Sequence, residues 1–416
     1  MRASDAPGCG RRSRRCSALA CLLALALLRA PAAAAAPPLC EDDRWTEASV
    51  DALENGTARP LVQCWRTPAC VRHSYLTPAR CAARPLDADW APADDAPGTA
   101  AARFAAAAGG ATSLAALADR FFANRTVMFT GDSVTEGLWD FLLCQAAREG
   151  LAPVKVPEHG SPPVDVDAGL AARLETFLAR RDAAPWAVNT HVGERPRHVA
   201  LLPRSGTILV RKPTYHFDAT DLAAQLSLAD VLIVNYGLHS AFGSAEEQAA
   251  YGADMAAAFA QAQQAAAQPG RAVVFRETAA QHFQGTGGFV SWAQAHPSNV
   301  SVACECTAMT AETERSNAVA GRNGAVAAAH ASAAAPDVRV QPFYALTADR
   351  HFGHEAAFCA FVQRGAATGC CDCTHMCYAP ALARALVAGM HAALVGSNAD
   401  AWLRDGGAPP QAQPPA

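Results

Sequence analysis

The chain has 416 residues, which is enough for one large α/β domain with an additional segment, or for two domains. About half of the residues are apolar, but many of these are alanine, so the apolar content alone is a weak sign of a large core. The formal charge is −4 and no large basic block occurs, which argues against nucleic acid as a partner.

The first 36 residues have the composition of a targeting segment. Four arginines between residues 11 and 15 precede an apolar run over residues 18–28, and small residues at 34–36 permit cleavage by signal peptidase. The run is shorter than the roughly 20 apolar residues that a transmembrane helix needs. We therefore expect residues 1–36 to be a signal peptide or, if they are not cleaved, a single N-terminal anchor of a type II Golgi membrane protein.

Cysteines and glycosylation sequons also point to the secretory pathway. Twelve of the 15 cysteines lie beyond the leader, an even number that fits disulfides formed in an oxidising compartment. They are Cys40, Cys64, Cys70, Cys81, Cys144, Cys304, Cys306, Cys359, Cys370, Cys371, Cys373 and Cys377. Asn-x-Ser/Thr sequons occur at Asn55, Asn124 and Asn299. These features together predict a protein of the Golgi lumen or a secreted protein.

The rest of the chain divides into three parts. Residues 37–115 hold four cysteines and many Pro and Ala without a sustained period, which predicts a disulfide-tied N-terminal segment that packs on the main domain. Residues 116–400 carry the strong periodic signals and form the expected main domain. The tail over residues 406–416 consists mainly of Pro, Gln and Ala and is expected to be disordered.

Short apolar runs bounded by turn residues predict buried strands, and longer segments with apolar residues at helical spacing predict helices. The expected strands cover residues 127–130, 198–202, 207–212, 230–235, 272–276 and 338–344. The expected helices cover residues 113–122, 134–144, 168–180, 244–267, 311–335 and 380–395. Strands that alternate with helices in this way predict an α/β fold with a mostly parallel sheet covered on both faces.

The first strong strand runs into Gly131, Asp132 and Ser133. Ser133 is therefore expected where the carboxyl end of a strand meets the amino end of a helix, which is where open α/β sheets bind their ligands. A hydroxyl at this position can attack a carbonyl, and neighbouring amides can hold the oxyanion that forms. The same three residues also suit an ordinary turn with a helix N-cap, so catalysis requires a base from elsewhere in the chain.

A candidate base lies just before the last helix, at Asp372-Cys-Thr-His375. A carboxylate three residues before an imidazole can hold one ring N–H, which leaves the other nitrogen to take a proton from a serine. The first strand–helix junction and the last loop lie on the same edge of a doubly wound sheet. These relationships allow a catalytic triad of Ser133, His375 and Asp372, but Asp-x-x-His alone is more often structural, and it is the family resemblance given below that implies the triad.

The cluster of Cys and His over residues 370–377, with Cys304 and Cys306 elsewhere, also allows a zinc site. An oxidising compartment favours disulfides instead, and no Cys-x-x-Cys pair repeats at finger-like spacing. We expect no metal here, and we expect disulfides that restrict the position of the loop carrying His375. The chain has no Gly-x-Gly-x-x-Gly and no Walker-type loop, so its sequence does not predict a bound nucleotide cofactor.

Four ordered blocks resemble the SGNH/GDSL hydrolase superfamily and, more narrowly, the PC-esterase group that includes the trichome-birefringence-like proteins. These blocks are Gly131–Ser133 with Trp139–Cys144, Asn235–Gly237, Arg276–Phe283 and Asp372–Cys377. The resemblance spans roughly residues 120–395. It implies a three-layer α/β/α, flavodoxin-like fold with a cysteine-containing N-terminal extension.

The resemblance also implies an oxyanion hole formed by the Ser133 amide, the Gly237 amide and the Asn235 side chain. A turn that closes a strand is the alternative for Gly237. His239 and His282 can line the cleft, but each can equally be a packing residue, and neither is assigned to the catalytic set.

Three positions depart from the pattern of this group. Glu136 stands where plant members usually carry Arg, His239 is one place later than the expected His-Trp pair, and residues 349–354 match only loosely. These departures leave the triad intact but leave the acceptor undetermined. Arg276 can pair with an acidic glycan or with an internal carboxylate, and the sequence does not choose between them.

The resemblance implies a secretory-pathway O-acyltransferase, in the first place an O-acetyltransferase, that acts on glycan or polysaccharide hydroxyls through an acyl-serine intermediate. It implies no bound cofactor but an acyl donor, either acetyl-CoA or another acetyl ester. A carbohydrate esterase is one alternative, because water can replace the sugar. A non-catalytic glycan-binding protein is the other. The sequence does not identify substrate-binding residues.

Overall fold

The computed structural model describes ten stretches of the chain: residues 113–157, 166–186, 195–196, 198–283, 306–310, 313, 317–348, 354, 373–376 and 380–400. All of them belong to one compact unit, Leu39–Ala416. The expected leader and tail lie outside the described residues, as does the expected N-terminal segment up to residue 112.

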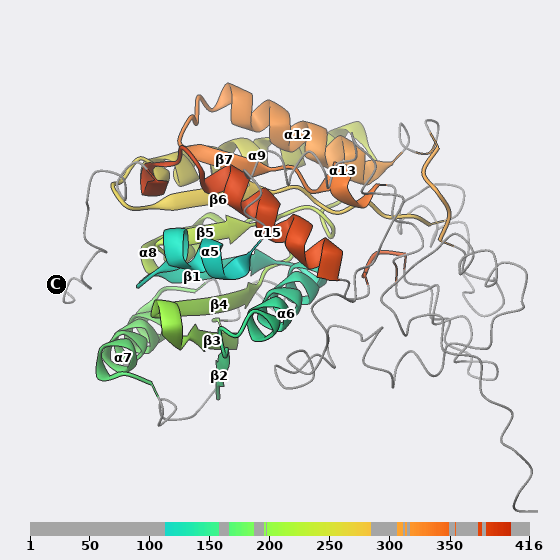
Figure 1. Cartoon of the computed structure of the whole chain (residues 1–416). Coiled ribbons are helices and arrows are strands. Elements are labelled where there is room, and N and C mark those ends of the chain that lie inside the picture. The colour runs from blue at the N-terminus through green and yellow to red at the C-terminus, as the bar shows by residue number, and fades with distance from the viewer. Residues whose placement is uncertain are drawn as a thin grey trace, which may run out of the picture. The chain divides into compact units, whose positions relative to one another are not determined.

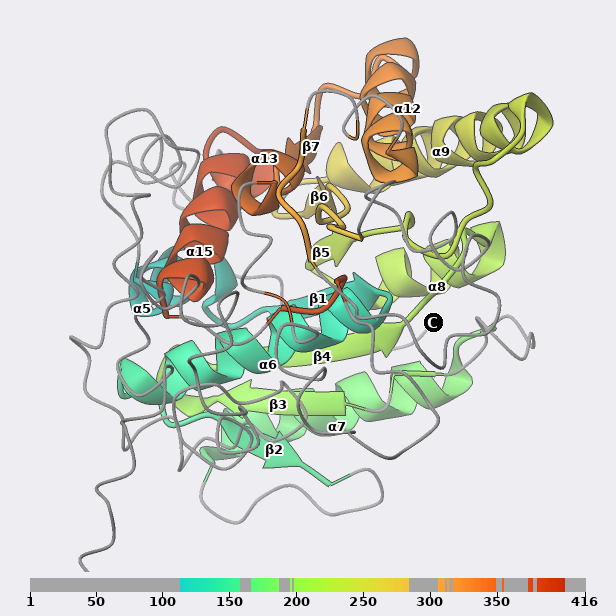
Figure 2. The ribbon, with the colours of Figure 1, turned by 90° about the vertical axis from the view of Figure 1, so that its right-hand side faces the viewer.

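Within the described residues, seven strands form one sheet in the order β2-β3-β4-β1-β5-β6-β7. Figure 2 shows this order from β2 at the bottom to β7 at the top. The strands are β1 Thr126–Gly131, β2 Val154–Val156, β3 His198–Leu202, β4 Thr207–Pro213, β5 Val231–Val234, β6 Ala272–Arg276 and β7 Val338–Gln341. Pairing is parallel from β4 to β7 and antiparallel where β3 meets β2 and β4.

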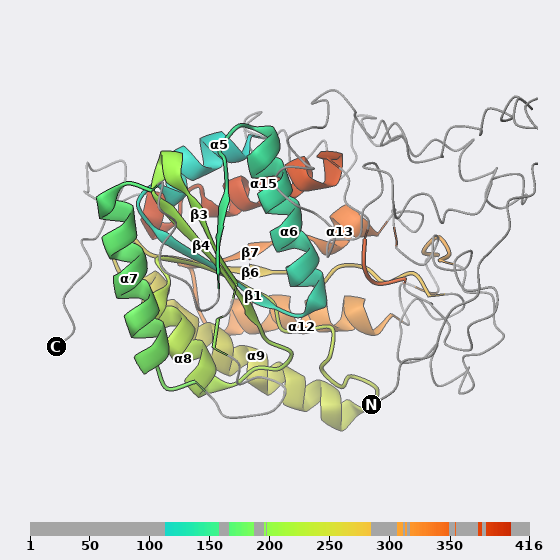
Figure 3. The same cartoon turned by 90° about the horizontal axis from the view of Figure 1, so that it is seen from below.

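Helices cover both faces of the sheet (Figures 1 and 3). One face carries α5 Leu114–Leu117 with the π-helical turn η4 Ala118–Phe122, α6 Ser133–Arg148, α13 Tyr344–Thr347 and α15 Pro380–Leu394. The other face carries α7 Ala168–Ala183, α8 Ala219–Leu228, α9 Ala245–Ala266 and α12 Ala318–Ser332. The predicted α/β fold with a mostly parallel, doubly covered sheet is therefore confirmed.

The strand residues alternate between two apolar cores. In β1, Val127 and Phe129 belong to the core under α6 and α15, whereas Met128 belongs to the core under α8 and α9. In β5, Ile233 and Leu232 divide in the same way. Successive side chains of a strand point to opposite faces, so a strand buried on both sides needs an unbroken apolar run. This requirement explains the runs on which the strand predictions were based.

Three elements were absent from the sequence predictions: β2, α8 and α13. Helix α8 begins after Asp218, whose carboxylate accepts a hydrogen bond from Asp221 N at 2.8 Å, and it buries Leu222 and Leu226. Its polar first turn resembles a loop in sequence, although three leucines, Leu222, Leu226 and Leu228, mark its buried face. The helix expected over residues 311–335 is described from Ala318, after an N-cap by Asn317.

A buried ion pair joins β4 to α8. Lys212 Nζ lies 2.7 Å from Asp221 Oδ2, and the two side chains are 0% and 1% exposed. Lys212 also donates to Thr214 Oγ1 at 3.1 Å. Burial raises the pKa of Asp221 above its ordinary value, because it disfavours the carboxylate more than the Lys212 charge stabilises it. The pair therefore ties the helix to the sheet at a considerable desolvation cost.

The parallel strands deliver four chain segments to one edge of the sheet. Strands β4, β1, β5 and β6 are neighbours, and their carboxyl ends point the same way. Each of these ends is followed directly by one polar residue, namely Thr214, Asp132, Asn235 or Glu277.

None of the described helices is both long enough and apolar enough to cross a membrane.

Candidate functional site

Ser133 lies at the junction predicted from the sequence. Strand β1 ends at Gly131, Asp132 is the N-cap of α6, and Ser133 is the first residue of that helix. Gly131 has φ +152°, and a Cβ on it would lie 2.2 Å from Thr135 Oγ1, so only glycine fits this turn. The N-cap role belongs to Asp132, which leaves the Ser133 hydroxyl available for another contact.

That contact is with His375. Ser133 Oγ and His375 Nε2 are 2.7 Å apart, although the two residues are 242 positions apart in the sequence. Both side chains are partly exposed, so a small molecule can reach them. An imidazole at this distance can take the hydroxyl proton when Nε2 is unprotonated and Nδ1 carries the ring proton. Asp372, the predicted partner of Nδ1, lies outside the described residues.

The first turn of α6 leaves one backbone amide for an external acceptor. The Asp132 carboxylate accepts from Val134 N at 2.9 Å and Thr135 N at 3.4 Å, and the Asp132 carbonyl accepts from Glu136 N at 3.1 Å. The Ser133 amide has no acceptor among the described residues. The N–H groups at a helix start attract negative charge, so this amide is suited to an oxyanion beside Ser133 Oγ.

The other two predicted oxyanion donors differ from each other. The Gly237 amide also has no acceptor among the described residues, and a Cβ on Gly237 would lie 1.9 Å from Thr278 Oγ1. Asn235 Nδ2 instead donates to Arg276 O at 2.9 Å and to Thr278 Oγ1 at 3.0 Å, which uses both amide hydrogens. The assignment of Asn235 to the oxyanion hole stays a prediction, and it requires the amide to leave these acceptors.

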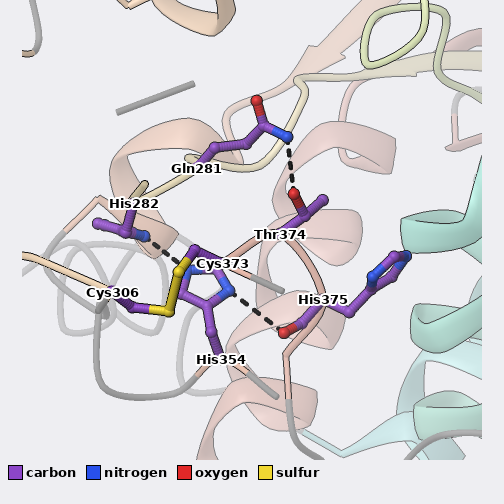
Figure 4. The surroundings of a disulfide bond; sticks show 7 residues. All are labelled: Gln281, His282, Cys306, His354, Cys373, Thr374 and His375. Atoms are coloured by element: carbon purple, nitrogen blue, oxygen red, sulfur yellow. Dashed lines mark hydrogen bonds between the residues drawn. A yellow bond between two sulfur atoms is a disulfide. The ribbon is translucent and has the colours of Figure 1, made fainter. Parts of the chain in front are cut away.

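Residues 373–376, called here the His375 loop, are fixed to neighbouring segments (Figure 4). Cys373 forms a disulfide with Cys306, which confirms that a disulfide restrains this loop. Gln281 Nε2 donates to Thr374 Oγ1 at 2.7 Å, and the His282 amide donates to the Cys373 carbonyl at 3.1 Å. Because the Cys306 and Cys373 sulfurs are bonded to each other, neither is a thiolate ligand for zinc.

Two further histidines support the same loop. His282 and His354 are 1% and 0% exposed, and His282 Nδ1 lies 2.6 Å from His354 Nε2. His354 Nδ1 donates to the His375 carbonyl at 3.2 Å, and His354 pairs with Met376 in an isolated antiparallel bridge. His282 is therefore a buried, hydrogen-bonded residue, as the packing alternative expected. His354 was not singled out from the sequence, where its only signal was a loose family match over residues 349–354.

Arg276 lies below the site, inside the protein. Its guanidinium donates to Thr135 Oγ1 and to the Glu277 carbonyl, both at 2.9 Å, and lies 5.0 Å from the centre of the Phe343 ring. Burial lowers the pKa of Arg276 to about 10, and the Asp132 charge opposes this shift. Arg276 is 3% exposed. This burial argues against contact with an acidic glycan, one of the two roles left open by the sequence, and the guanidinium is bonded to a hydroxyl and a carbonyl rather than to a carboxylate.

An aromatic pair lies at the carboxyl edge of the sheet, after the two strands that neighbour β1. Tyr215 follows β4 and His239 follows β5, the two neighbours of β1, and their ring centres are 4.8 Å apart in an edge-to-face arrangement. The pKa of His239 is lowered by partial desolvation, although its ring keeps contact with solvent. The Asp132 charge opposes this shift, while His216 and His375 add to it.

An apolar crevice lies beside His375, between the start of α6 and the segments that follow β6 and β7. It is lined by Val134, Gly137, Leu138, Phe141, Ala279, Phe343, His375 and Met376. The volume of this cavity is about 10 Å³, roughly the space of one water molecule. The crevice has room for a methyl-sized group.

No family model matches this chain, and no curated protein matches it. The contact between Ser133 and His375 is therefore the main basis for a function. No group of three or more His, Cys, Asp or Glu side chains suited to holding a metal ion occurs within the described part of the chain.

Proposed function

We propose that the protein is a serine acyltransferase of the SGNH type that resembles the PC-esterase group and transfers an acyl group to glycan hydroxyls. The observation that carries this proposal is the 2.7 Å contact between Ser133 Oγ and His375 Nε2 at the carboxyl edge of a mostly parallel sheet. Two helical layers around this sheet are compatible with the flavodoxin-like arrangement of that superfamily.

In the first half-reaction, His375 Nε2 takes the proton of Ser133 as Oγ attacks the carbonyl carbon of the acyl donor. The carbonyl oxygen becomes negatively charged and is held by the amides of Ser133 and Gly237, with Asn235 as the third predicted donor. As the tetrahedral intermediate collapses, the His375 imidazolium gives its proton to the leaving group. The product is an acyl ester on Ser133.

In the second half-reaction, a sugar hydroxyl gives its proton to His375 Nε2 and attacks the acyl-serine carbonyl. Collapse of this second intermediate returns the proton to Ser133 Oγ and releases the acylated glycan. Asp372, as predicted from the sequence, would hold the Nδ1 proton of His375 throughout, which keeps Nε2 free to act as the base.

The size of the apolar crevice favours a short acyl group. It lies against the imidazole of His375 and has a volume of about 10 Å³, which suits the methyl of an acetyl group. We propose acetyl as the transferred group. The donor is either acetyl-CoA or another acetyl ester, and no bound cofactor is required.

A glycan acceptor is supported by the pair formed by Tyr215 and His239. Aromatic rings with an accessible polar edge suit the mixed apolar and polar surface of a sugar. A secretory-pathway location, in the Golgi lumen or outside the cell, is supported by the Cys306–Cys373 disulfide and by the disulfide-bonded state of Cys144.

Hydrolysis is the competing reaction, because Ser133 and His375 are both partly exposed and water can reach the acyl-serine. The two activities are distinguished by incubating the protein with an aryl acetate, with and without an oligosaccharide. Acetyl transfer to the sugar supports the transferase, and acetate release that is indifferent to sugar supports the esterase.

Covalent labelling tests whether the protein is a catalyst at all. A fluorophosphonate probe and mass spectrometry are expected to place the label, or an acetyl adduct, on the Ser133 peptide of the wild type and not on Ser133→Ala. Ser227→Ala, which alters an exposed residue on α8, serves as the control and should label normally. A wild type without label or adduct that still binds glycan would replace the proposal with a non-catalytic glycan-binding protein.

A further inference from the structure

The two histidines behind the His375 loop belong to one continuous line of hydrogen bonds. His282 Nε2 lies 2.7 Å from the Ala348 carbonyl, and His282 Nδ1 lies 2.6 Å from His354 Nε2. His354 Nδ1 then lies 3.2 Å from the His375 carbonyl. Figure 4 shows the part of this line from His282 through His354 to the His375 carbonyl, with the His375 imidazole pointing away from the two rings. Both rings are buried.

Within the contacts described, the two ends of this line fix the positions of two protons. A carbonyl oxygen only accepts hydrogen bonds, so His282 Nε2 and His354 Nδ1 must each carry a proton. A neutral imidazole carries one N–H. If both rings were neutral, His282 Nδ1 and His354 Nε2 would face each other as two lone pairs at 2.6 Å. Moving either ring's proton to the centre only transfers the mismatch to one of the carbonyls.

We propose that His282 and His354 share a third proton and together carry one positive charge, and that this pair positions the backbone of His375. A proton between the facing nitrogens turns the 2.6 Å contact into a charge-assisted hydrogen bond. The two carbonyls at the ends then accept from a cation, which offsets part of the cost of burying its charge.

The link to catalysis rests on the proposed function. His354 Nδ1–H holds the carbonyl of the residue whose side chain reaches Ser133, while the His282 amide holds the Cys373 carbonyl two residues earlier. The loop backbone is thus hydrogen-bonded on both sides of Thr374, and the Thr374 hydroxyl accepts a hydrogen bond from Gln281. His282 and His354 touch no reacting atom in this scheme, so they are positioning residues that act through the His375 loop.

The shared proton is tested directly on the full-length protein labelled with ¹⁵N-histidine. We expect one far-downfield proton coupled to a ring nitrogen of both His282 and His354, absent from His282→Gln and His354→Gln. Two neutral rings without such a proton in the folded wild type would overturn the proposal. This measurement requires no activity, so it stands even if the wild type fails to label on Ser133 and the proposed function falls.

The positioning role is tested by a matched pair of variants at one position. In His354→Asn the new side-chain amide nitrogen can replace Nδ1 and keep the bond to the His375 carbonyl, whereas in His354→Gln the longer amide reaches the Nε2 position and loses that bond. We expect kcat for aryl acetate to fall roughly tenfold in His354→Gln and less than about threefold in His354→Asn, with KM unchanged in both. Equal losses of kcat in two folded variants would contradict positioning through this carbonyl.

Discussion

The disulfide between Cys306 and Cys373 joins the chain two residues before His375 to a segment that lies against His282. The Thr307 amide donates to the His282 carbonyl at 2.9 Å, and the His282 amide donates to the Cys373 carbonyl at 3.1 Å. His282 is thus held between the segments that carry the two sulfurs. The backbone next to the proposed base is restrained by a covalent bond and by hydrogen bonds at once.

Removal of this disulfide should therefore affect both stability and the candidate site. We expect Cys306→Ser/Cys373→Ser to lower the free energy of unfolding by about 2–4 kcal/mol, because the unfolded chain regains the freedom of a long loop. The rate of fluorophosphonate labelling at Ser133 should fall as well, since His375 is held less firmly. Urea titration and labelling kinetics measure the two effects. A variant that loses stability but labels at the wild-type rate would show that the disulfide stabilises the fold without positioning His375.

Ser133 and His375 should behave as one catalytic unit. We expect Ser133→Ala and His375→Ala each to lower kcat by about 10³-fold or more, and the double variant to be no worse than the single variants. The reason is that neither group activates the acyl transfer without the other. Initial rates of aryl acetate turnover test this cycle, with Ser227→Ala as the control. Effects that multiply in the double variant would show that the two residues act independently.

Asn235→Ala distinguishes a structural amide from an oxyanion donor. In the conformation described, the amide joins the residue after β5 to the end of β6 through Arg276 O and to the next segment through Thr278 Oγ1. We expect the variant to lose about 1–3 kcal/mol of stability, because two buried groups lose their partner. We expect kcat to fall less than about tenfold. A loss of about 10²–10³-fold in kcat would instead show that the amide turns toward the oxyanion during the reaction.

The buried pair of Lys212 and Asp221 should show strong coupling. Lys212→Met leaves a carboxylate of 1% exposure without its cation, and we expect a loss of about 3–5 kcal/mol at pH 7. The double variant Lys212→Met/Asp221→Leu should recover much of this loss, since it buries no charge. Urea titrations of the two single variants and the double variant measure the coupling. Additive losses would show that the two charges do not interact appreciably.

His391 should make the protein less stable in mild acid. Burial lowers its pKa below 6.5, the nearby Arg120 charge adds to the shift, and Asp400 opposes it. Between its folded and unfolded pKa values the unfolded chain binds more protons, so the free energy of unfolding falls as the pH drops below about 6.5. His391→Met removes this contribution and should lose less stability between pH 7 and pH 5. An identical pH dependence in both proteins would contradict this assignment.

The sheet was predictable because its central strands are buried on both faces and therefore appear as unbroken apolar runs. Strands β1, β5 and β6 follow this rule. The three-residue edge strand β2 does not, since one side of it has no partner among the described strands and only one of its residues, Val156, is buried. Length and burial, rather than residue preference, decided which strands could be found.

The candidate site was predictable where the chain makes local motifs and not where it makes distant contacts. Gly131-Asp132-Ser133 indicated the strand–helix turn that carries the serine. The position of His375 before the last helix indicated the candidate base that contacts this serine. The engagement of Asn235 by Arg276 O depends on a neighbouring strand. The facing rings of His282 and His354 depend on segments 72 residues apart. No local pattern records contacts of this kind.

The last described strand of the sheet ends at Gln341, whereas the imidazole that faces Ser133 is at position 375. During synthesis, every described strand thus leaves the ribosome before the residue that, under the proposed function, makes the serine reactive. A chain cut short between these two points would keep the nucleophile and lack the group that ionises it. An incomplete chain that lacks His375 would therefore not react with acetyl esters at Ser133.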